Sequence, residues 1–256
     1  METHQKASKP SSISGLLDNT TATTTNVPVY QLNLNLSFPP PELAEPSGLL
    51  AVGGDLSPKR LLQAYSRGIF PWYSPGDPLL WWSPDPRTVI FPEEFHCPRR
   101  LKRTVRQKRF AVRADTCFTE VIEACATIPR QHEKGTWITR EMKEAYIQLH
   151  EEGFAHSIET WQDGELVGGL YGVSLGRCFF GESMFSRVSD ASKTALAVMA
   201  RKLADWNFRF IDCQFQTDHL AQFGAREIPR STYLRLLERG LERPTRRGPW
   251  EFSQST

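Results

Sequence analysis

The sequence predicts a mixed α/β (α+β) protein in which a small N-terminal domain, rich in proline and aromatic residues, precedes a larger domain. From Thr88 onward, apolar runs of strand length alternate with segments that repeat at the helical period. Prolines and tryptophans are instead concentrated between Phe38 and Pro92. The Ser-Pro-Asp-Pro stretch at residues 83–86 marks the boundary between the two parts. We therefore divide the chain into a disordered leader (1–36), a small domain (37–86), a main domain (87–241) and a tail (242–256).

Composition excludes several classes of protein. The 256 residues carry a net charge of only +2, so any affinity for nucleic acid must come from a local basic region. The five cysteines are odd in number and form no C-x-x-C pair, which argues against a disulfide framework and against a thiolate zinc site. No apolar run approaches the roughly 18 residues of a membrane span, and the N-terminus lacks the apolar core of a secretory signal. We expect a cytoplasmic protein with no membrane segment and no metal.

The N-terminal part contains one clear helical pattern. Residues 1 to 28 are rich in Ser, Thr and Asn and show no periodicity, as expected of a disordered leader. A helix is predicted over 57–67, with Ser57 as its N-cap and Gly68 as its stop signal. Most aromatic residues after Gly68 are expected to fill the core of the small domain. Trp72 differs, because its place at the edge of a turn would let the indole stack on a nucleobase.

A basic segment opens the main domain. Its seven positive residues, with no acid among them, are Arg99, Arg100, Lys102, Arg103, Arg106, Lys108 and Arg109. Leu101 and Val105 lie four residues apart, so the segment can form a helix with one buried stripe. Like charges at this density repel one another unless an anion neutralises them. A phosphate backbone is the natural partner, and a merely solvated basic face is the alternative.

The other elements of the main domain follow from periodicity and from cap and turn signals. We expect strands at 88–91, 110–113, 156–161, 167–173, 177–180 and 208–211. We expect helices at 117–126, from Thr139 to Gly153, at 191–205, at 220–226 and at 231–241. Thr116 and Thr139 are the predicted N-caps of the first two helices.

Three polar residues stand out in the apolar stretch from 168 to 214. Glu182 is predicted just beyond the end of one strand, and another strand ends on Asp212 and Gln214. Residues two apart on a strand face the same side, so Asp212 and Gln214 should lie together. A salt bridge or a helix cap would explain each acid alone. Three polar groups in an apolar setting instead favour an active site.

Familiar catalytic and nucleotide-binding motifs are absent. The sequence contains no G-x-G-x-x-G and no phosphate-binding loop ending in Gly-Lys-Ser/Thr. In G-E-S-M-F, Phe185 stands where the nucleophile elbow of a serine hydrolase has its second glycine.

The sequence resembles the bacterial leucyl/phenylalanyl-tRNA–protein transferases. The matching motifs are GLLAVGGDLSPKRLLQAYSRGIFPWYSPGDPLLWWSPDPR, GTWITREM, AHSIE, ELVGGLYGV, FFGESMFS, ASKTAL and IDCQ, followed by HL and GAREIPR. They extend from about Phe38 to Leu237, and the chain departs from the family only in its leader and its tail. The resemblance implies a GNAT-like acyltransferase fold for the main domain, which fits the predicted strand order. It also implies that the small domain helps to form the substrate cleft.

The resemblance implies a function as well. Enzymes of this family take Leu or Phe, and less readily Met, from aminoacyl-tRNA. They attach it to the N-terminal Arg or Lys of acceptor proteins, which marks these proteins for degradation by the N-end rule. No ATP, metal or other cofactor is expected, because the aminoacyl ester is already activated. A monomer is expected.

The resemblance also assigns roles to individual residues. Asp212 and Gln214 match the catalytic pair, and Glu182 matches the active-site glutamate. The residues that match substrate-binding positions are Trp72 and Trp137 for the terminal adenosine, Leu170, Phe179 and Met184 for the apolar side chain, and Ser183. The basic run 99–109 matches the region that binds the acceptor stem.

Ester aminolysis requires a neutral amine near the carbonyl carbon and a group that stabilises the oxyanion. We expect Asp212 to relay the amine proton and Gln214 to orient the amine, because a neutral amide is a very poor base. Two alternatives stay open. An acetyl-CoA acyltransferase would need a glycine-rich pyrophosphate loop, which residues 186–193 lack. A tRNA-binding protein without catalytic activity would share the basic segment.

Overall fold

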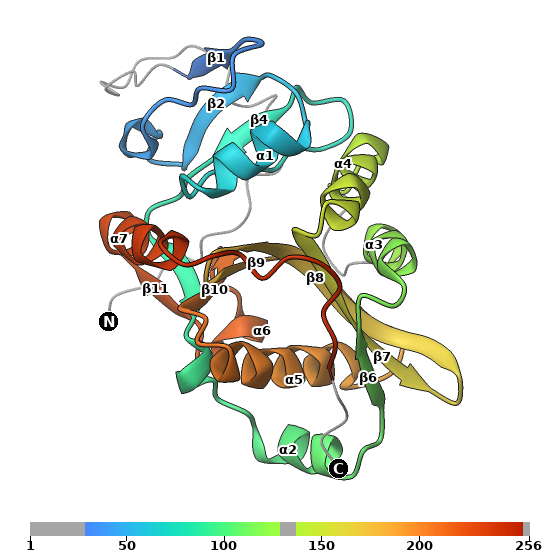
Figure 1. Cartoon of the computed structure of the whole chain (residues 1–256). Helices are drawn as coiled ribbons and strands as arrows, with labels where there is room; N and C mark the ends of the chain where they lie inside the picture. Colours follow the sequence, from blue (N-terminus) through green and yellow to red (C-terminus); the bar gives the residue numbers. More distant parts are fainter. Residues whose placement is uncertain (1–28, 129–136, 253–256) are drawn as a thin grey trace, which may run out of the picture.

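The computed structural model describes residues 29–128 and 137–252, which form two α/β units, each built on its own sheet (Figure 1). The smaller sheet contains, in spatial order, β1 (Tyr30–Leu32), β2 (Leu49–Gly53), β4 (Leu80–Trp82) and β3 (Phe70–Pro71). The larger sheet contains β11 (Arg226–Ile228), β5 (Arg87–Ile90), β10 (Phe210–Gln214), β9 (Cys178–Ser186), β8 (Glu165–Leu175), β7 (Ala155–Gln162) and β6 (Ala111–Ala114). The mixed α/β architecture and the separate N-terminal unit confirm the predicted fold class.

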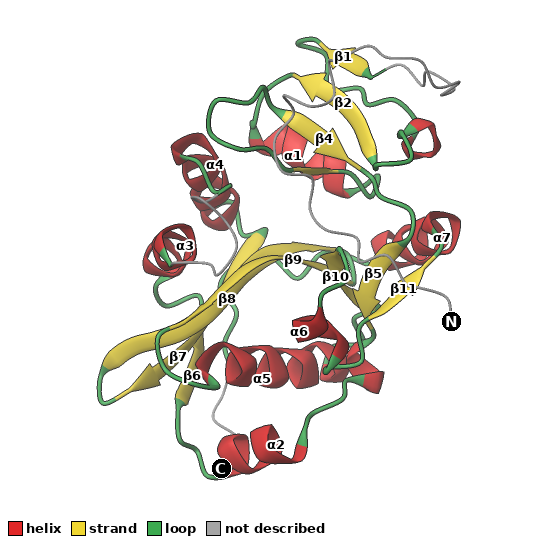
Figure 2. Ribbon diagram, turned by 180° about the vertical axis from the view of Figure 1, so that it is seen from behind, coloured by secondary structure: helices red, strands yellow, loops and turns green. Residues whose placement is uncertain are grey.

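Helices lie on both faces of the larger sheet (Figure 2). One face carries α5 (Ala191–Asp205), with α2 (Arg99–Arg106) beyond it. The other face carries α3 (Phe118–Thr127), α4 (Arg140–Glu151) and the smaller unit with its helix α1 (Pro58–Tyr65). The chain after β10 adds α6 (Asp218–Ala221) and α7 (Arg230–Leu241), and two short 3-10 turns are η2 (Pro41–Leu43) and η3 (Pro92–Glu94). The buried apolar side chains form two main clusters, one on each face.

The smaller unit begins earlier than the sequence predicts. β1 pairs in parallel with β2, so the leader assigned to residues 1–36 is too long. Residues 1–28 lie outside the described residues. Trp81 and Phe70 are buried, which confirms that most aromatic residues of this unit fill its core.

The three predicted N-cap residues differ in what their side chains do. Thr139 caps α4, because its Oγ1 accepts a hydrogen bond from the Met142 amide at 3.3 Å. Ser57 occupies the N-cap position of α1, but its side chain makes no capping hydrogen bond. Thr116 is not a cap at all: Cys117 is the N-cap of α3, and the Thr116 hydroxyl donates to Glu159 at 2.9 Å.

The Thr139→Ala variant is expected to lower the free energy of unfolding by about 1 kcal/mol, because a first-turn amide of α4 loses its acceptor. Urea titration measures this loss. Ser57→Ala is the matched control and should change stability much less, since no capping hydrogen bond is removed. Equal losses in the two variants would contradict the assignment of Thr139 as the functional cap.

β9 is longer than predicted. It pairs with β8 from Cys178 opposite Leu175 to Ser186 opposite Gly168, with a bulge at Glu182, because Gly172 lies opposite Gly181 and Tyr171 opposite Ser183. Its parallel pairing with β10 stops much earlier, at Phe180 opposite Asp212. The prediction that Glu182 follows a strand end is therefore wrong. Glu182 lies within β9, because the ladder to β8 continues after the ladder to β10 has ended.

The end of β10 is irregular. The register between β10 and β5 shifts between Asp212 and Gln214, and Gln214 has a φ of 57°. A bulge of this kind changes the direction in which the following side chain points. The expectation that simple alternation puts Asp212 and Gln214 on one face is therefore wrong.

The C-terminal region is partly as expected. α7 confirms the last predicted helix, but α6 ends at Ala221, and Arg226 begins β11, which pairs with β5. The expected tail packs on the main unit: Trp250 is 2% exposed, and its amide donates to Asp115 at 2.6 Å. Within the described ranges no helix is long and apolar enough to cross a membrane.

Candidate active site

A buried ion pair stands where β5, β10 and α7 meet. Asp212 has no exposed surface and accepts hydrogen bonds from Arg87 Nε at 2.8 Å and Arg87 Nη2 at 2.7 Å. The Tyr233 hydroxyl donates to the same carboxylate at 2.8 Å, and the backbone amide of Gln214 donates to it at 3.0 Å. The Asp212 carboxylate is thus fully occupied by groups of the protein.

The Arg87 guanidinium is held as firmly as its partner. It lies over the rings of Phe70 and Tyr233, at 4.7 and 4.6 Å from their centroids, and its Nη1 donates to the Gly68 carbonyl at 3.2 Å. Burial is the largest single effect and would lower the pKa of Arg87, but the charge and hydrogen bonds of Asp212, together with Tyr233 and Glu182, raise it above its usual value. Arg87 therefore stays charged and ties α1, β5 and β10 to a fixed arrangement.

A second polar cluster surrounds Glu182. Its carboxylate accepts hydrogen bonds from Tyr65 of α1 at 2.7 Å and from Tyr146 of α4 at 3.1 Å, and the two tyrosine hydroxyl oxygens lie in contact with each other. These contacts join the smaller unit to the main unit.

The surroundings of Glu182 alter its protonation. Burial raises the pKa of Glu182 to about 7, while the two phenol hydrogen bonds act in the opposite direction. The Asp212 charge raises this pKa further, and the Arg87 charge lowers it. The two clusters are neighbours in the sheet, because Asp212 lies opposite Phe180, two residues before Glu182. Glu182 is the less enclosed of the two carboxylates, since its side chain is only partly buried.

Gln214 lies beside the first cluster. Its side-chain amide nitrogen is buried and has no hydrogen-bond partner among the described residues. Its backbone amide is fixed by Asp212. A buried donor without an acceptor is costly, so a position of this kind suits a ligand atom that supplies the acceptor.

The two tryptophans expected at the adenosine lie in neighbouring segments. Trp72 packs against Phe215, whose ring centroid is 5.6 Å away and which follows Gln214 directly. Trp137 is partly exposed and lies just before α4. The segments meet where the Tyr73 and Thr139 hydroxyls bond at 3.0 Å. Both tryptophans pack against the apolar cluster on the Glu182 side of the sheet.

The residues expected in the apolar pocket lie on the other side. Leu170 and Phe179 are buried in the cluster that faces α5, and Met184, opposite Leu170 in the β8–β9 ladder, packs against it. Only Met184 of the three has appreciable exposed surface. Ser183 precedes Met184 and is partly exposed. The parallel ladder between β9 and β10 ends at Phe180 and Asp212, so the two strands are no longer paired beyond this point.

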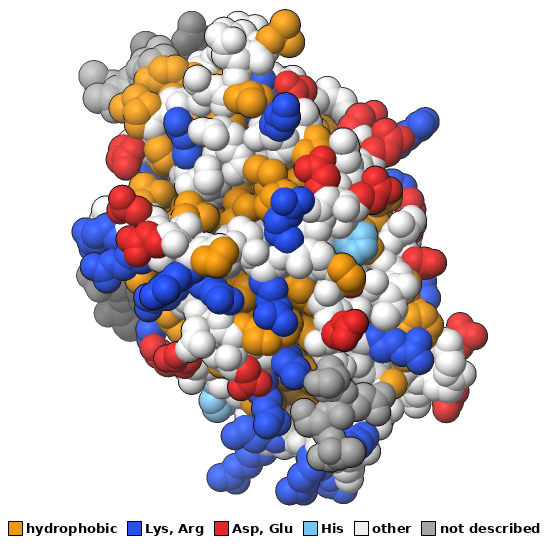
Figure 3. All heavy atoms as spheres, in the orientation of Figure 1, with side chains coloured by type: hydrophobic (Ala, Val, Ile, Leu, Met, Phe, Trp, Pro, Cys, Tyr) orange, Lys and Arg blue, Asp and Glu red, His pale blue; other side chains and the backbone are white. Residues whose placement is uncertain are grey.

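The basic segment forms α2, as predicted. Its Leu101 is buried, and its basic side chains are exposed. Arg100 forms an ion pair with Asp190 at 3.4 Å. Lys and Arg side chains gather at the end of the molecule where α2 lies (Figure 3).

Comparison with known proteins decides the family. The family model described as "Leucyl/phenylalanyl-tRNA protein transferase" matches residues 89–238, and the model of its N-terminal domain matches residues 54–85. The chain belongs to the leucyl/phenylalanyl-tRNA–protein transferase family. It is therefore an enzyme, an aminoacyltransferase, and the family resemblance of the sequence is confirmed.

Relatives match over nearly their full length. A leucyl/phenylalanyl-tRNA–protein transferase from Desulfatibacillum aliphaticivorans is 59% identical over 226 residues, covering 88% of this chain and 97% of the relative. One from Myxococcus xanthus is 58% identical over 213 residues, covering 83% of this chain and 91% of the relative. A solved structure of a functionally unknown protein from Staphylococcus epidermidis aligns with a TM-score of 0.40 at 10% identity, covering 71% of this chain and 68% of that one.

Four members of the two polar clusters in this transferase are absent from the sequence-based expectations: Arg87, Tyr65, Tyr146 and Tyr233. Tyr65 and Tyr146 have the helical spacing of core residues, and their hydroxyls give no signal in the sequence. Arg87 does carry one, since it follows directly after the Pro-rich boundary and is the first residue of a strand that is buried throughout. A lone arginine in such a strand demands a buried partner.

Proposed function

We propose that this transferase moves Leu or Phe, and less readily Met, from aminoacyl-tRNA to the N-terminal Arg or Lys of acceptor proteins, marking them for degradation by the N-end rule. The family supports transfer from tRNA to protein. The observation that carries the proposal is a pair of groups that follow the Phe180–Asp212 pair on two strands: Glu182, a partly exposed carboxylate with a pKa near 7, and the side-chain amide nitrogen of Gln214, which is unpaired among the described residues. The reaction requires no ATP and no metal, because the ester is already activated. We also propose that the enzyme is a cytoplasmic monomer.

We propose a GNAT-like fold for the main unit. Its support is the β8–β9 hairpin followed by α5 and by β10, which returns parallel to β9. The acyl donor would enter where this parallel pair stops. Trp72 and Trp137 would hold the terminal adenosine on the Glu182 side, since aromatic faces bind bases by stacking. The aminoacyl side chain would pass toward Met184, and toward Leu170 and Phe179 behind it.

In the proposed reaction, the acceptor's α-amine attacks the ester carbonyl carbon, and a C–N bond forms as the carbonyl electrons move to oxygen. The amine proton passes to Glu182. The C–O bond to the ribose then breaks, and the ribose oxygen takes up the proton held by Glu182, which returns to the carboxylate form. An α-amine titrates near 8 and the Glu182 carboxyl near 7, so this transfer is close to balanced.

Gln214 and Asp212 have different roles in this proposal. The Gln214 amide nitrogen can donate to the carbonyl oxygen as negative charge develops, and its amide oxygen can orient the amine. Asp212 is occupied by Arg87, Tyr233 and the Gln214 backbone, so we assign it a positioning role. Asp212 fixes the position of Gln214 through its backbone amide and does not relay the proton itself.

Removing one of the two tyrosine hydroxyls that donate to Glu182 is expected to shift the pH dependence of transfer. The Tyr146 hydrogen bond lowers the pKa of Glu182, so Tyr146→Phe should raise it. Glu182 accepts a proton only as the carboxylate, so the rise of kcat with pH should move to higher pH in the variant. The control is Tyr73→Phe, whose hydroxyl contacts Thr139 and not Glu182. An unshifted profile for Tyr146→Phe would count against Glu182 as the proton acceptor.

We propose that α2 and the residues after it bind the acceptor stem through Arg99, Arg100, Lys102, Arg103, Arg106, Lys108 and Arg109. The support is their exposed positive charge, which a phosphate backbone would neutralise.

The transfer assay tests the proposed function. The enzyme is incubated with labelled Leu-tRNA or Phe-tRNA and with a peptide that begins with Arg. Labelled peptide is the expected product, and a peptide that begins with Glu should remain unlabelled. No label in the Arg peptide with any of the donors would overturn the proposal.

A further inference from the structure

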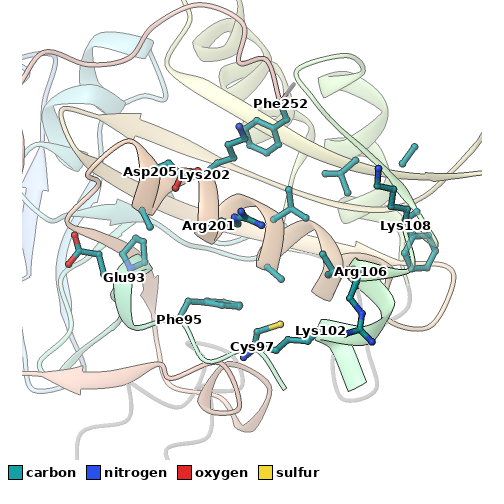
Figure 4. A pocket seen from close by; sticks show the side chains of 18 residues that line it. Glu93, Phe95, Cys97, Lys102, Arg106, Lys108, Arg201, Lys202, Asp205 and Phe252 are labelled. Atoms are coloured by element: carbon teal, nitrogen blue, oxygen red, sulfur yellow. The ribbon is translucent and has the colours of Figure 1, made fainter. Parts of the chain in front are cut away.

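A groove of about 820 Å³ separates α2 from α5, on the face of the main sheet turned away from Glu182 (Figure 4). Its apolar lining includes Phe95, Val105, Val198 and Phe252, which are all only partly buried. This volume falls in the range typical of ligand sites. The apolar side chains in the groove therefore still have surface that a ligand could cover.

Five cations surround this apolar surface. Lys102, Arg106 and Lys108 come from α2 and the turn after it, and Arg201 and Lys202 come from α5 on the other side (Figure 4). In the described part of the chain none of the five forms an ion pair. Two acids, Glu93 and Asp205, also line the groove, so the cations are in excess. A ligand of this groove should be an anion.

Aromatic rings and cations together in one groove indicate which class of anion would bind there. A duplex backbone needs exposed charge but no apolar recess. A strand with an unpaired base presents both a phosphate and a flat apolar face, and proteins bind such bases by pairing cations with aromatic side chains. Phe95 and Phe252 supply two rings. Phe95 lies just before α2 in the sequence, and Phe252 lies after α7.

We propose that this groove holds an unpaired nucleotide of the aminoacyl-tRNA, with its base against the apolar walls and its phosphates at the surrounding Lys and Arg side chains. The inference rests on the proposed function and assigns a second contact on the same RNA. Arg99 and Arg103 are exposed on α2 outside the groove, so they can bind the acceptor stem while Lys102, Arg106 and Lys108, at the groove, contact the unpaired nucleotide of the same tRNA. The site is separate from the one proposed for the terminal adenosine, because Trp72 and Trp137 pack on the opposite face of the sheet.

The kinetic test compares two acyl donors, full-length Leu-tRNA and 3′-leucyl-adenosine, which lacks the rest of the RNA. The double variant Arg201→Ala/Phe252→Ala should raise KM for Leu-tRNA about 10-fold. Its kcat and its activity with leucyl-adenosine should be unchanged. Arg239→Ala, which removes an exposed charge on α7, is the control and should change neither. An unchanged KM for Leu-tRNA in the double variant would overturn the inference.

These outcomes separate the inference from the proposed function. If the wild-type enzyme uses neither donor, the proposed function fails. If it uses both and the double variant matches the wild type, only the groove inference fails. If the variant loses binding of an acidic acceptor protein while tRNA binding is kept, the groove is a protein-docking surface and the inference is wrong.

Chemical probing of bound tRNA gives a second readout. An unpaired nucleotide should be protected by the wild-type enzyme and reactive again with Ala197→Trp, which places a large ring in the groove. Protection of the stem phosphates by α2 should persist in that variant, which would also show that it is folded. Absence of any protected unpaired nucleotide with the wild-type enzyme would contradict the inference.

Discussion

Replacing Arg87 with Met is expected to lower the free energy of unfolding by about 3–5 kcal/mol, because Asp212 would be left buried without a cation. The pair has almost no exposed surface, with side-chain exposures of 1% and 0%. Water cannot screen the remaining charge, and Tyr233 alone cannot neutralise it. Urea denaturation followed by tryptophan fluorescence measures the loss.

Two further variants show whether the loss comes from the unpaired charge. Arg226→Met breaks an exposed ion pair with Glu94 and should cost only about 0–1 kcal/mol. The double variant Arg87→Met/Asp212→Leu removes both charges, so it should be more stable than Arg87→Met alone. A double variant less stable than the single one would mean that Asp212 does not depend on Arg87 in this way.

Replacing Glu182 with Gln is expected to reduce kcat about 100-fold or more, because the amine proton loses its acceptor. KM for Leu-tRNA should change little, because Glu182 is not among the residues proposed to contact the RNA. In the wild type, kcat should rise with pH through about 7 as Glu182 ionises, and the variant should lack this rise. Glu165→Gln, an exposed carboxyl at the start of β8, is the control. Wild-type turnover in Glu182→Gln would remove this residue from the mechanism.

Stability gives a separate readout of Glu182. Its pKa is raised from 4.5 in the unfolded chain to about 7 in the fold, so the folded state binds this proton more tightly. The stability that this proton contributes is fully present below about pH 4.5. It is lost as the pH rises through 7. The Glu182→Gln variant should lose less stability over that interval than the wild type.

The sequence predicts those elements whose pattern is local. α5 is an example, because Ala195, Met199 and Leu203 repeat at the helical period and are all buried. The basic helix α2 is also predicted by its local pattern, with Leu101 as its buried residue. The end of β9 is not, because the length of a strand depends on which neighbour continues to pair with it. β8 continues beside β9 after β10 has turned away.

The candidate site shows the same limit more strongly. Asp212, Gln214 and Glu182 were identified through polar residues in an apolar stretch and through family motifs. Their partners Tyr65 and Tyr146 lie 117 and 36 residues from Glu182 in sequence, and only the packing of α1 and α4 brings them together. Asp212 is paired with Arg87, which lies 125 residues away in the sequence, and this pairing determines which roles Asp212 can have. No local pattern contains these contacts.

The central claim is that transfer takes place between Glu182 and Gln214, on the face of the sheet that carries Trp72 and Trp137. A crystal structure with a non-hydrolysable leucyl-adenosine analogue tests it most directly. The account predicts adenine against the two tryptophans and the leucyl carbonyl oxygen within hydrogen-bond distance of the Gln214 amide nitrogen. An analogue bound on the α5 face, or with its carbonyl remote from both Gln214 and Glu182, would contradict it.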